Sequence, residues 1–153
     1  MPPEAAANVA AIRVRAEARA AAEGVAFRGF LTPSEAWALF SRGDLVLVDT
    51  RTHAERDLIG YVPGSVHIEW YDYPEKKMNA HFLDQLREKV EPDRAVAFLC
   101  RSGVRSKHAA TLAAQNGYAL AYDVLKGYEG DKNAQGQRVV NGWRVDGLPW
   151  RQD

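Results

Sequence analysis

The chain has 153 residues, 46% of them hydrophobic and 26% charged, which is ordinary for one globular domain with a moderate core. Lys plus Arg and Asp plus Glu both number 20, so no basic excess supports nucleic-acid binding. The single cysteine, Cys100, excludes an internal disulfide, a CxxC redox pair and a thiolate zinc cage.

The N-terminal stretch PPEAAANVAAIRVRAEARAAAEG is rich in alanine and predicts a helix within residues 1–24, ending at Gly24. Its arginines would suit a transit peptide, but glutamates lie between them and serine is absent. We therefore expect a helix that packs on, or extends from, a domain of residues 25–153.

LTPSEAWALF carries the signals of a helix start. Thr32 suits the N-cap, Pro33 the first helical position, and Glu35 can close a capping box. Gly43 ends this helix, and the apolar run LVLVDT that follows predicts a buried strand.

YVPGSVHIEW contains a Pro63–Gly64 turn followed by a strand in which Val66 and Ile68 alternate with polar residues. From Pro74 onward, apolar residues recur at every fourth position, which predicts a helix closed by Pro92. The apolar residues of that predicted helix are Met78, Phe82, Leu86 and Val90.

AVAFL predicts a second buried strand that ends at Cys100, SKHAATLAAQNGY a helix stopped by Gly117, and LAYDVL a further strand. The tail is rich in glycine and turn residues, and we expect Trp143 and Trp150 to pin it to the body. Strands that alternate with helices predict an α/β fold. Its central, mainly parallel sheet carries helices on both faces, with an extra N-terminal helix.

Cys100 is followed directly by a short basic stretch that contains a glycine, FLCRSGVRSK. Ligands of parallel sheets bind at the carboxyl ends of strands, near helix N-termini. Gly103 permits a tight turn in which the backbone N–H groups of residues 101–106 can form a concave nest. Together with the arginines and the lysine of this stretch, such a nest stabilises a thiolate and attracts an anion.

A buried structural cysteine is the ordinary alternative, but apolar or periodic residues would then be expected to follow it. Cysteine phosphatases need an arginine at the sixth position after the cysteine. Here that position is Ser106, and the nearest arginine is Arg105. The smaller loop suits a single sulfur atom carried on the cysteine better than it suits a phosphoryl group.

The sequence resembles the rhodanese family of sulfurtransferases. The resemblance spans Gly29 to Trp150 and is carried, in order, by LTPSEAWALF, LVDTRTHAER, GYVPGSVHIEW, FLCRSGVRS, DVLKGYEG and GWRVDGLPW. It implies a compact rhodanese-like α/β domain with a central parallel sheet.

The resemblance also implies a mechanism. Cys100 is the catalytic residue: its thiolate attacks the outer sulfur of thiosulfate, sulfite leaves, and the persulfide passes its sulfur to cyanide or a thiol. No metal or organic cofactor is required. The implied partners are a small anionic sulfur donor and a cyanide, thiol or protein acceptor. We expect the rest of the loop to bind the substrate: Arg101, Ser102, Gly103, Val104, Arg105 and Ser106.

A basic residue directly after the cysteine accompanies thiosulfate use in the family, and Arg101 matches it. Two departures stand out. Tyr61 replaces the signature histidine, and DKNAQGQRVVN (131–141) separates segments that the family joins directly. We interpret 131–141 as an inserted hairpin or lid that shapes which acceptor can approach.

Asp49 and Arg51 resemble an acid–base pair, but we interpret them as a structural ion pair. Tyr128 and Trp143 could wall a pocket, yet aromatic residues in such a tail are more often core anchors. Ser102 and Ser106 suit either hydrogen bonding to the persulfide or capping of the following helix. We give three histidines no catalytic role, because a preformed thiolate needs no base: His53, His67 and His108.

The alternatives to a sulfurtransferase are a non-catalytic rhodanese-like interaction module and, less favoured, a phosphatase-like or arsenate-reductase-like enzyme. Inactive members typically lose the cysteine, which this chain keeps. An unpaired thiol fits a reducing compartment, and no segment predicts a membrane span or signal peptide, so we expect a cytoplasmic protein with no membrane partner.

Overall fold

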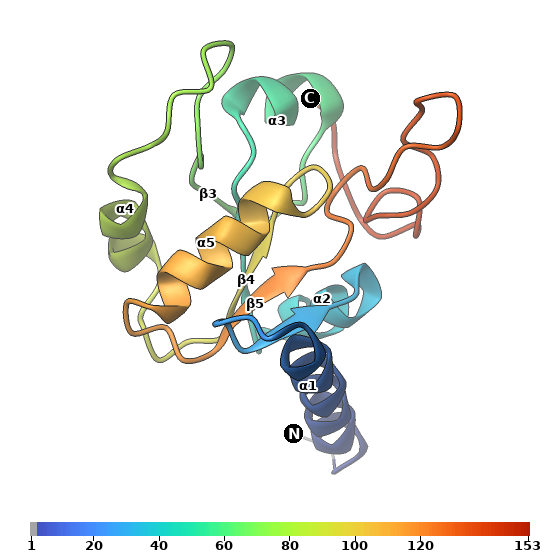
Figure 1. Cartoon of the computed structure of the whole chain (residues 1–153). Coiled ribbons are helices and arrows are strands. Elements are labelled where there is room, and N and C mark those ends of the chain that lie inside the picture. The colour runs from blue at the N-terminus through green and yellow to red at the C-terminus, as the bar shows by residue number, and fades with distance from the viewer. Residues whose placement is uncertain (1–2) are drawn as a thin grey trace.

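The computed structural model describes residues 3–153 of the chain, with side chains described from Asn8 onward. This part forms five strands: β1 (Gly29–Leu31), β2 (Val46–Asp49), β3 (Val66–His67), β4 (Val96–Leu99) and β5 (Ala121–Val124). It also forms five helices: α1 (Pro3–Glu23), α2 (Pro33–Phe40), α3 (His53–Ile59), α4 (Phe82–Lys89) and α5 (Val104–Ala114). The strands make one sheet in the order β1-β5-β4-β2-β3, and every pair is parallel. The predicted α/β fold is confirmed (Figure 1).

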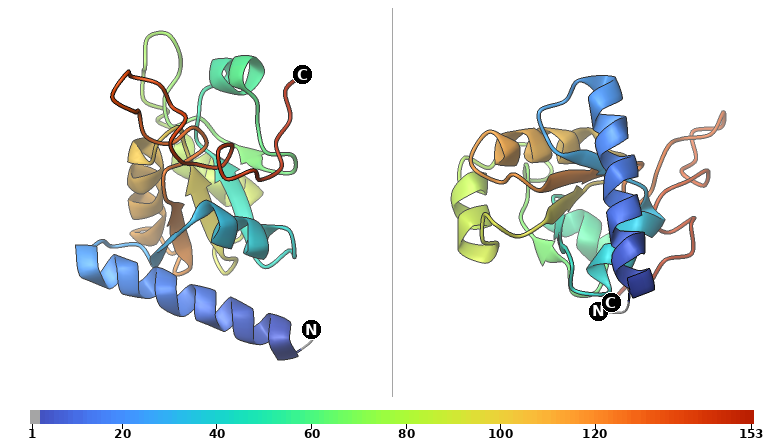
Figure 2. Two further views of the ribbon diagram at one scale, coloured as in Figure 1. Left: turned by 90° about the vertical axis from the view of Figure 1, so that its right-hand side faces the viewer. Right: turned by 90° about the horizontal axis from the view of Figure 1, so that it is seen from below.

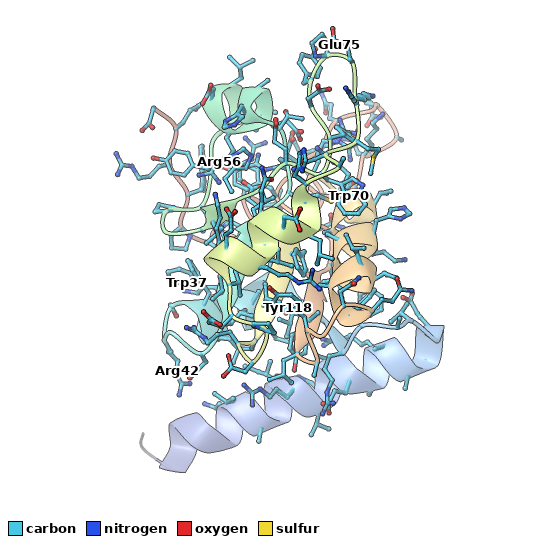
Figure 3. The ribbon with its side chains drawn as sticks, turned by 90° about the vertical axis from the view of Figure 1, so that its left-hand side faces the viewer. Trp37, Arg42, Arg56, Trp70, Glu75 and Tyr118 are labelled. Atoms are coloured by element: carbon cyan, nitrogen blue, oxygen red, sulfur yellow. The ribbon has the colours of Figure 1, made fainter. Side chains whose placement is uncertain are left out.

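Helices cover both faces of the sheet, as the sequence predicts. One hydrophobic cluster joins α2 and the tail residues Tyr128 and Trp143 to one face, and a second joins α4 and α5 to the other. Trp70, labelled in Figure 3, connects α4 to α5, because its ring meets Phe82 edge-on and stacks against His108. The strand β4 is buried along its whole length between these two layers.

Helix α1 packs along β1 and lies on the side of the domain opposite α3 and the tail (Figure 2). Its Ile12 and Ala16 belong to one hydrophobic cluster, while Ala20 belongs to the other. Gly29 on β1 permits this contact, since a Cβ there would lie 2.8 Å from atoms of Ala16. Arg19 adds a hydrogen bond to the carbonyl of Phe30. The helix therefore belongs to the same packed body as the sheet.

The predicted start of α2 is confirmed in detail. The Thr32 side chain accepts the Glu35 N–H, the Glu35 carboxylate accepts the Thr32 N–H, and Pro33 is the first helical residue. A second capping box opens α3, where Thr52 and Glu55 make the same reciprocal pair. Both helices begin where short polar side chains satisfy backbone N–H groups that lack a helical partner.

The helix predicted from Pro74 begins only at Phe82, so the first half of that prediction is wrong. Met78 is 53% exposed and pairs with Tyr71 in an isolated antiparallel bridge. The Asp72 carboxylate accepts the Lys77 N–H, which closes this turn locally. The apolar residues keep a spacing of four through this turn, but its backbone is satisfied locally, by the Asp72 carboxylate and by the Lys77 carbonyl that accepts the Asp72 N–H.

The three-residue strand β1 was not predicted, because GFL is too short to show alternation. Helix α5 starts at Val104, two residues before the predicted segment. Among the described residues, no helix combines the length and apolar character needed to cross a membrane.

Candidate active site

Cys100 lies directly after β4, the strand between β5 and β2, at the carboxyl edge of the sheet. The residue is 1% exposed, and its Sγ accepts the backbone N–H of Gly103 at 3.1 Å. The Ser106 Oγ lies 3.3 Å from the same sulfur. The sulfur is thus held inside a turn by one backbone donor and one hydroxyl.

The turn depends on Gly103, which has a φ of 119°, in a region that favours glycine. Gly103 is also the N-cap of α5, and it provides no side-chain cap. The partial positive charge of a helix N-terminus favours an anionic sulfur. Ser106 does not cap the helix; its hydroxyl faces the sulfur instead.

The three basic residues of the loop have different environments. Arg105 is buried, and both ends of its guanidinium fork donate to Glu55, at 2.6 and 2.9 Å. Burial alone would raise the pKa of Glu55, but the hydrogen bonds and charge of Arg105 lower it below the usual range. Arg101 and Lys107 are exposed. The charge of Arg105 is therefore balanced, while Arg101 and Lys107 face solvent.

Glu55 was not singled out in the sequence, and it lies 50 positions from Arg105. It performs two tasks, because it closes the capping box of α3 and holds Arg105. The Arg105 guanidinium also lies over the Tyr71 ring, 4.8 Å from its centroid. These contacts fix the position of the first turn of α5 relative to α3.

Residues 127–129, which follow β5, hold the Cys100 loop through backbone hydrogen bonds. The N–H of Tyr128 donates to the Cys100 carbonyl at 2.8 Å, and the N–H of Glu129 donates to the Arg101 carbonyl at 2.9 Å. Gly127 makes this approach possible, since a Cβ there would lie 2.4 Å from the Cys100 carbonyl oxygen. Figure 1 shows the chain after β5 running beside the N-terminal end of α5.

Tyr128 and Trp143 are fully buried, so both are core anchors rather than walls of a pocket. Burial raises the pKa of Tyr128 to about 12. Trp150 is 40% exposed, and its ring meets Tyr128 edge-on. Both tryptophans attach the tail to the domain: Trp143 packs inside the core, and Trp150 packs against Tyr128 at the edge of the core.

Asp49 and Arg51 form the structural ion pair that the sequence predicts, with a distance of 2.9 Å and no exposure of either side chain. Arg56 adds a second ion pair to the same carboxylate, at 3.0 Å. Burial alone would raise the pKa of Asp49, but Arg51 lowers it below the ordinary value through its charge and hydrogen bonds. Arg51 also donates to the Gly60 carbonyl, which ties the end of β2 to the end of α3.

Among the described residues, the hydrogen-bond partners of the Cys100 sulfur are Gly103 and Ser106, and no histidine is one of them. His67 Nε2 is 2.6 Å from the Arg51 carbonyl oxygen, and its ring meets that of His53 edge-on. Burial lowers the pKa of His67. His108 is exposed on α5 and stacks on Trp70.

A cavity of about 280 Å³ opens beside the loop, on the side of β5. The loop contributes Ser102, Gly103 and Val104 to its lining. Asp123 on β5 also lines this cavity, although it is only 1% exposed. In the sequence, Asp123 is the one charged residue of the otherwise mainly apolar run AYDVL. It was not among the residues predicted to form the site.

Residues 131–141 form an excursion whose two ends meet. A Cβ on Gly142 would lie 2.8 Å from the Gly130 nitrogen. The Asn141 side chain accepts the Asp131 N–H and donates to the Asp131 carboxylate. Lys126, which also lines the cavity, pairs with Asp131 at 3.1 Å. The segment contains turns rather than the strands of a hairpin.

Comparisons with known proteins agree with this arrangement. A model of the rhodanese-like domain matches residues 32–134. The uncharacterized protein RP600 of Rickettsia prowazekii is 32% identical over 74% of this chain and 88% of its own length. The thiosulfate sulfurtransferase GlpE of Actinobacillus succinogenes is 29% identical over 78% of this chain and 86% of its own length.

Among solved structures, Rv0390 from M. tuberculosis is 40% identical and superposes with a TM-score of 0.74. The match covers 81% of this chain and 97% of that one.

Proposed function

The chain belongs to the rhodanese-like domain family, and from that premise we propose that it is a sulfurtransferase that carries a sulfane sulfur as a persulfide on Cys100. The observation that carries the proposal is the position of the Cys100 sulfur, held in the turn by the Gly103 N–H and the Ser106 hydroxyl. The likeness to thiosulfate sulfurtransferases supports thiosulfate as donor.

The first step forms a bond between Cys100 Sγ and the outer sulfur of thiosulfate and breaks its bond to the central sulfur. The electron pair of the broken bond leaves with sulfite. Cyanide or a thiolate then attacks the outer sulfur of the persulfide, and Cys100 leaves as a thiolate. Both forms of the sulfur are anions, and the donors around Sγ stabilise both.

Two features disfavour phosphoryl transfer. The loop places its arginine at position 105, one residue earlier than the phosphatase spacing requires. The guanidinium fork of Arg105 is occupied by Glu55, so it is not free to hold a phosphoryl group in two-point fashion. A non-catalytic interaction module is disfavoured because the cysteine and its donors are intact.

Intact-protein mass before and after thiosulfate tests the proposal, with Cys100→Ser as the matched control. We expect a gain of one sulfur atom in the wild type only, discharged by cyanide as thiocyanate. A gain with mercaptopyruvate but not with thiosulfate would keep the persulfide and change the donor. No gain with either donor would overturn the proposal.

We further propose that residues 131–141 influence which acceptor reaches the persulfide, since Asp131 is tied to Lys126 at the rim of the cavity. Joining Gly130 to Gly142 directly is sterically reasonable, because these glycines already touch. Equal discharge rates of the shortened and full chains with cyanide, small thiols and protein thiols would refute this influence. We place the activity in a reducing compartment such as the cytoplasm, where the single thiol stays unpaired.

A further inference from the structure

We propose that the cavity beside the Cys100 loop is a binding site for a small primary ammonium compound, whose charged group pairs with Asp123. The cavity has a volume of about 280 Å³ and is lined by residues of the loop, of α5, of β1 and β5, and of the end of α1. The loop contributes Ser102, Gly103 and Val104 to the lining but not Cys100. The site is therefore separate from the sulfur-binding turn and independent of sulfur transfer.

Asp123 differs from the other buried carboxyl groups because no cation accompanies it. Three carboxyl side chains are buried among the described residues. Two of them, Glu35 and Asp49, each pair with two arginines at 2.7 to 3.0 Å. Asp123 is 1% exposed, its Oδ1 has no hydrogen-bond partner among the described residues, and none of the ion pairs found there includes it. A buried acceptor without a partner is costly, and a donor that enters the cavity removes that cost.

The charges around the cavity favour a cation. Glu23 lines the cavity as the last residue of α1, and no ion pair among the described residues includes it. The C-terminal end of a helix carries partial negative charge, which adds to the charge of Glu23. Lys126 also lines the cavity, but Asp131 balances its charge at 3.1 Å. Two carboxyl groups of the lining, Glu23 and Asp123, therefore face one cation that has no acidic partner, Lys107.

The position of Lys107 shows that the lining accepts an ammonium group. Its Nζ lies over the ring of Phe30, 5.7 Å from the centroid, and Phe30 is itself part of the lining. The face of an aromatic ring attracts a cation. Lys107 is exposed and forms no ion pair with Asp123, so the carboxyl group remains available to a ligand. Phe30 and Leu125 give the carbon atoms of such a ligand an apolar wall.

The condition of the test follows from the state of the carboxyl group. Burial raises the pKa of Asp123 to about 8, and a bound cation would lower it, because it favours the ionised form. At pH 8.5 the carboxyl group is mostly ionised without a ligand. A primary alkylamine is protonated at the same pH, since the pKa of such a group, like that of lysine, is about 10.4. Binding is therefore measured at pH 8.5.

Two matched pairs of small probes test the inference through the amide NMR signals of three lining residues, Ser102, Gly103 and Val104. Isobutylamine and isobutanol differ in the ammonium group, as do L-valine and isovalerate. We expect the ammonium member of a pair to bind at least about tenfold more tightly, because hydrogen bonds between charged groups are the strong ones. If only one pair shows this difference, the site takes plain amines or amino acids respectively, and ammonium recognition stands. No difference in either pair would overturn the inference in the wild type alone.

Asp123→Asn keeps the shape of the side chain and removes its charge. We expect it to abolish the preference for the ammonium probes. Asp84→Asn, the same change at an exposed position of α4, should leave the preference unchanged. Equal affinities for isobutylamine in the wild type and in Asp123→Asn would overturn the assignment of the site to this carboxyl group.

Lys107→Met distinguishes the two sources of the ammonium group. A plain amine should bind the variant more tightly, because a like charge is gone, whereas an amino acid should bind it less tightly, because its carboxylate loses a cation. Binding of an ammonium probe to Lys107→Met but not to the wild type would make Lys107 itself the cation that serves Asp123. That result would overturn the inference.

Sulfur uptake and ammonium binding are separable. Because Cys100 does not line the cavity, we expect the ammonium preference to persist in Cys100→Ser, which cannot carry a persulfide. Ammonium binding in a protein that takes sulfur from no donor would uphold the second site and reject the sulfurtransferase. Sulfur uptake in a protein with no ammonium preference would do the reverse.

Discussion

Two aspartates at the carboxyl edge of the sheet flank the strand that leads to Cys100, and they are buried alike but charged differently. Asp49 lies on β2 and Asp123 on β5, one on each side of β4. Asp49 accepts hydrogen bonds from two arginines, and its pKa is lowered below the ordinary value against the effect of burial. Asp123 has no such cation, and burial raises its pKa to about 8.

The comparison shows that burial alone does not decide the charge of a carboxyl group. The same sheet edge provides one anion, Asp49, that holds loops together, and one carboxyl group, Asp123, whose pKa is raised to about 8 by burial. Arg51 connects Asp49 to Gly60 and stacks on Tyr128, which makes that side of the site a structural support. Asp123 lines a cavity, and its Oδ1 has no hydrogen-bond partner among the described residues, so the charge on this side of the site is not fixed by an ion pair.

Removing the Arg51 cation from Asp49 should cause the largest loss of folding stability. In Arg51→Met, Asp49 remains buried with only Arg56 as a charged partner, and the removal of one partner from a buried ion pair costs about 3–5 kcal/mol. Chemical denaturation at pH 7 measures the loss. Arg151→Met is the control, because Arg151 pairs with Asp153 at the exposed surface, where such pairs contribute about 0–1 kcal/mol. Equal losses of stability in Arg51→Met and Arg151→Met would show that Asp49 does not depend on Arg51 as a buried ion-pair partner.

The stability that each aspartate contributes should depend on pH with opposite signs. The contribution of Asp123 should fall as pH rises. The folded protein keeps a proton on Asp123 up to about pH 8, whereas the unfolded chain releases it near the ordinary value of 3.8. Between these values the folded state binds more protons, so the free energy of unfolding falls as pH rises. The slope that this one group contributes is about 1.4 kcal/mol per pH unit.

Asp123→Asn removes that slope. Denaturation of both proteins at pH 5 and pH 7 should show the variant gaining about 2–3 kcal/mol relative to the wild type over these two pH units. A constant difference between the two proteins would mean that Asp123 is ionised throughout, and the contrast with Asp49 would disappear. The Asp49 side has the reverse sign, because its lowered pKa contributes stability that is lost only as pH falls below about 4.

The sequence predicts the elements whose signals are local. The capping box at Thr32, the buried run that leads to Cys100 and the turn at Gly103 each depend on residues within one short stretch. The helix predicted from Pro74 fails because its apolar repeat continues into a turn held by Asp72, where side-chain hydrogen bonding overrides periodicity.

The site was predictable only in part. The cysteine and its turn are contiguous in the sequence, so their chemistry could be inferred. The pairing of Arg105 with Glu55 joins two positions 50 residues apart, and nothing local indicates it. Asp123 left a visible signal, a carboxylate inside a buried strand, but its position beside Ser106 depends on how α5 packs on β5.

The smallest expected effect comes from Lys107. It tests how much an exposed positive charge contributes to the pKa of Asp123, and so to the difference between Asp123 and Asp49. Lys107 is exposed, and its positive charge lowers the pKa of Asp123 without touching the carboxyl group. Lys107→Met should therefore move the pH range over which the wild type loses stability relative to Asp123→Asn upward, more at low salt than at 1 M salt, because exposed charges are screened. Lys89→Met, the same change on α4, should leave that range in place. A downward shift in Lys107→Met, or an equal shift in both variants, would show that the pH dependence of stability does not report a carboxyl group beside Lys107. An upward shift confined to Lys107→Met would assign the pH dependence to Asp123 by a route that leaves Asp123 itself unchanged.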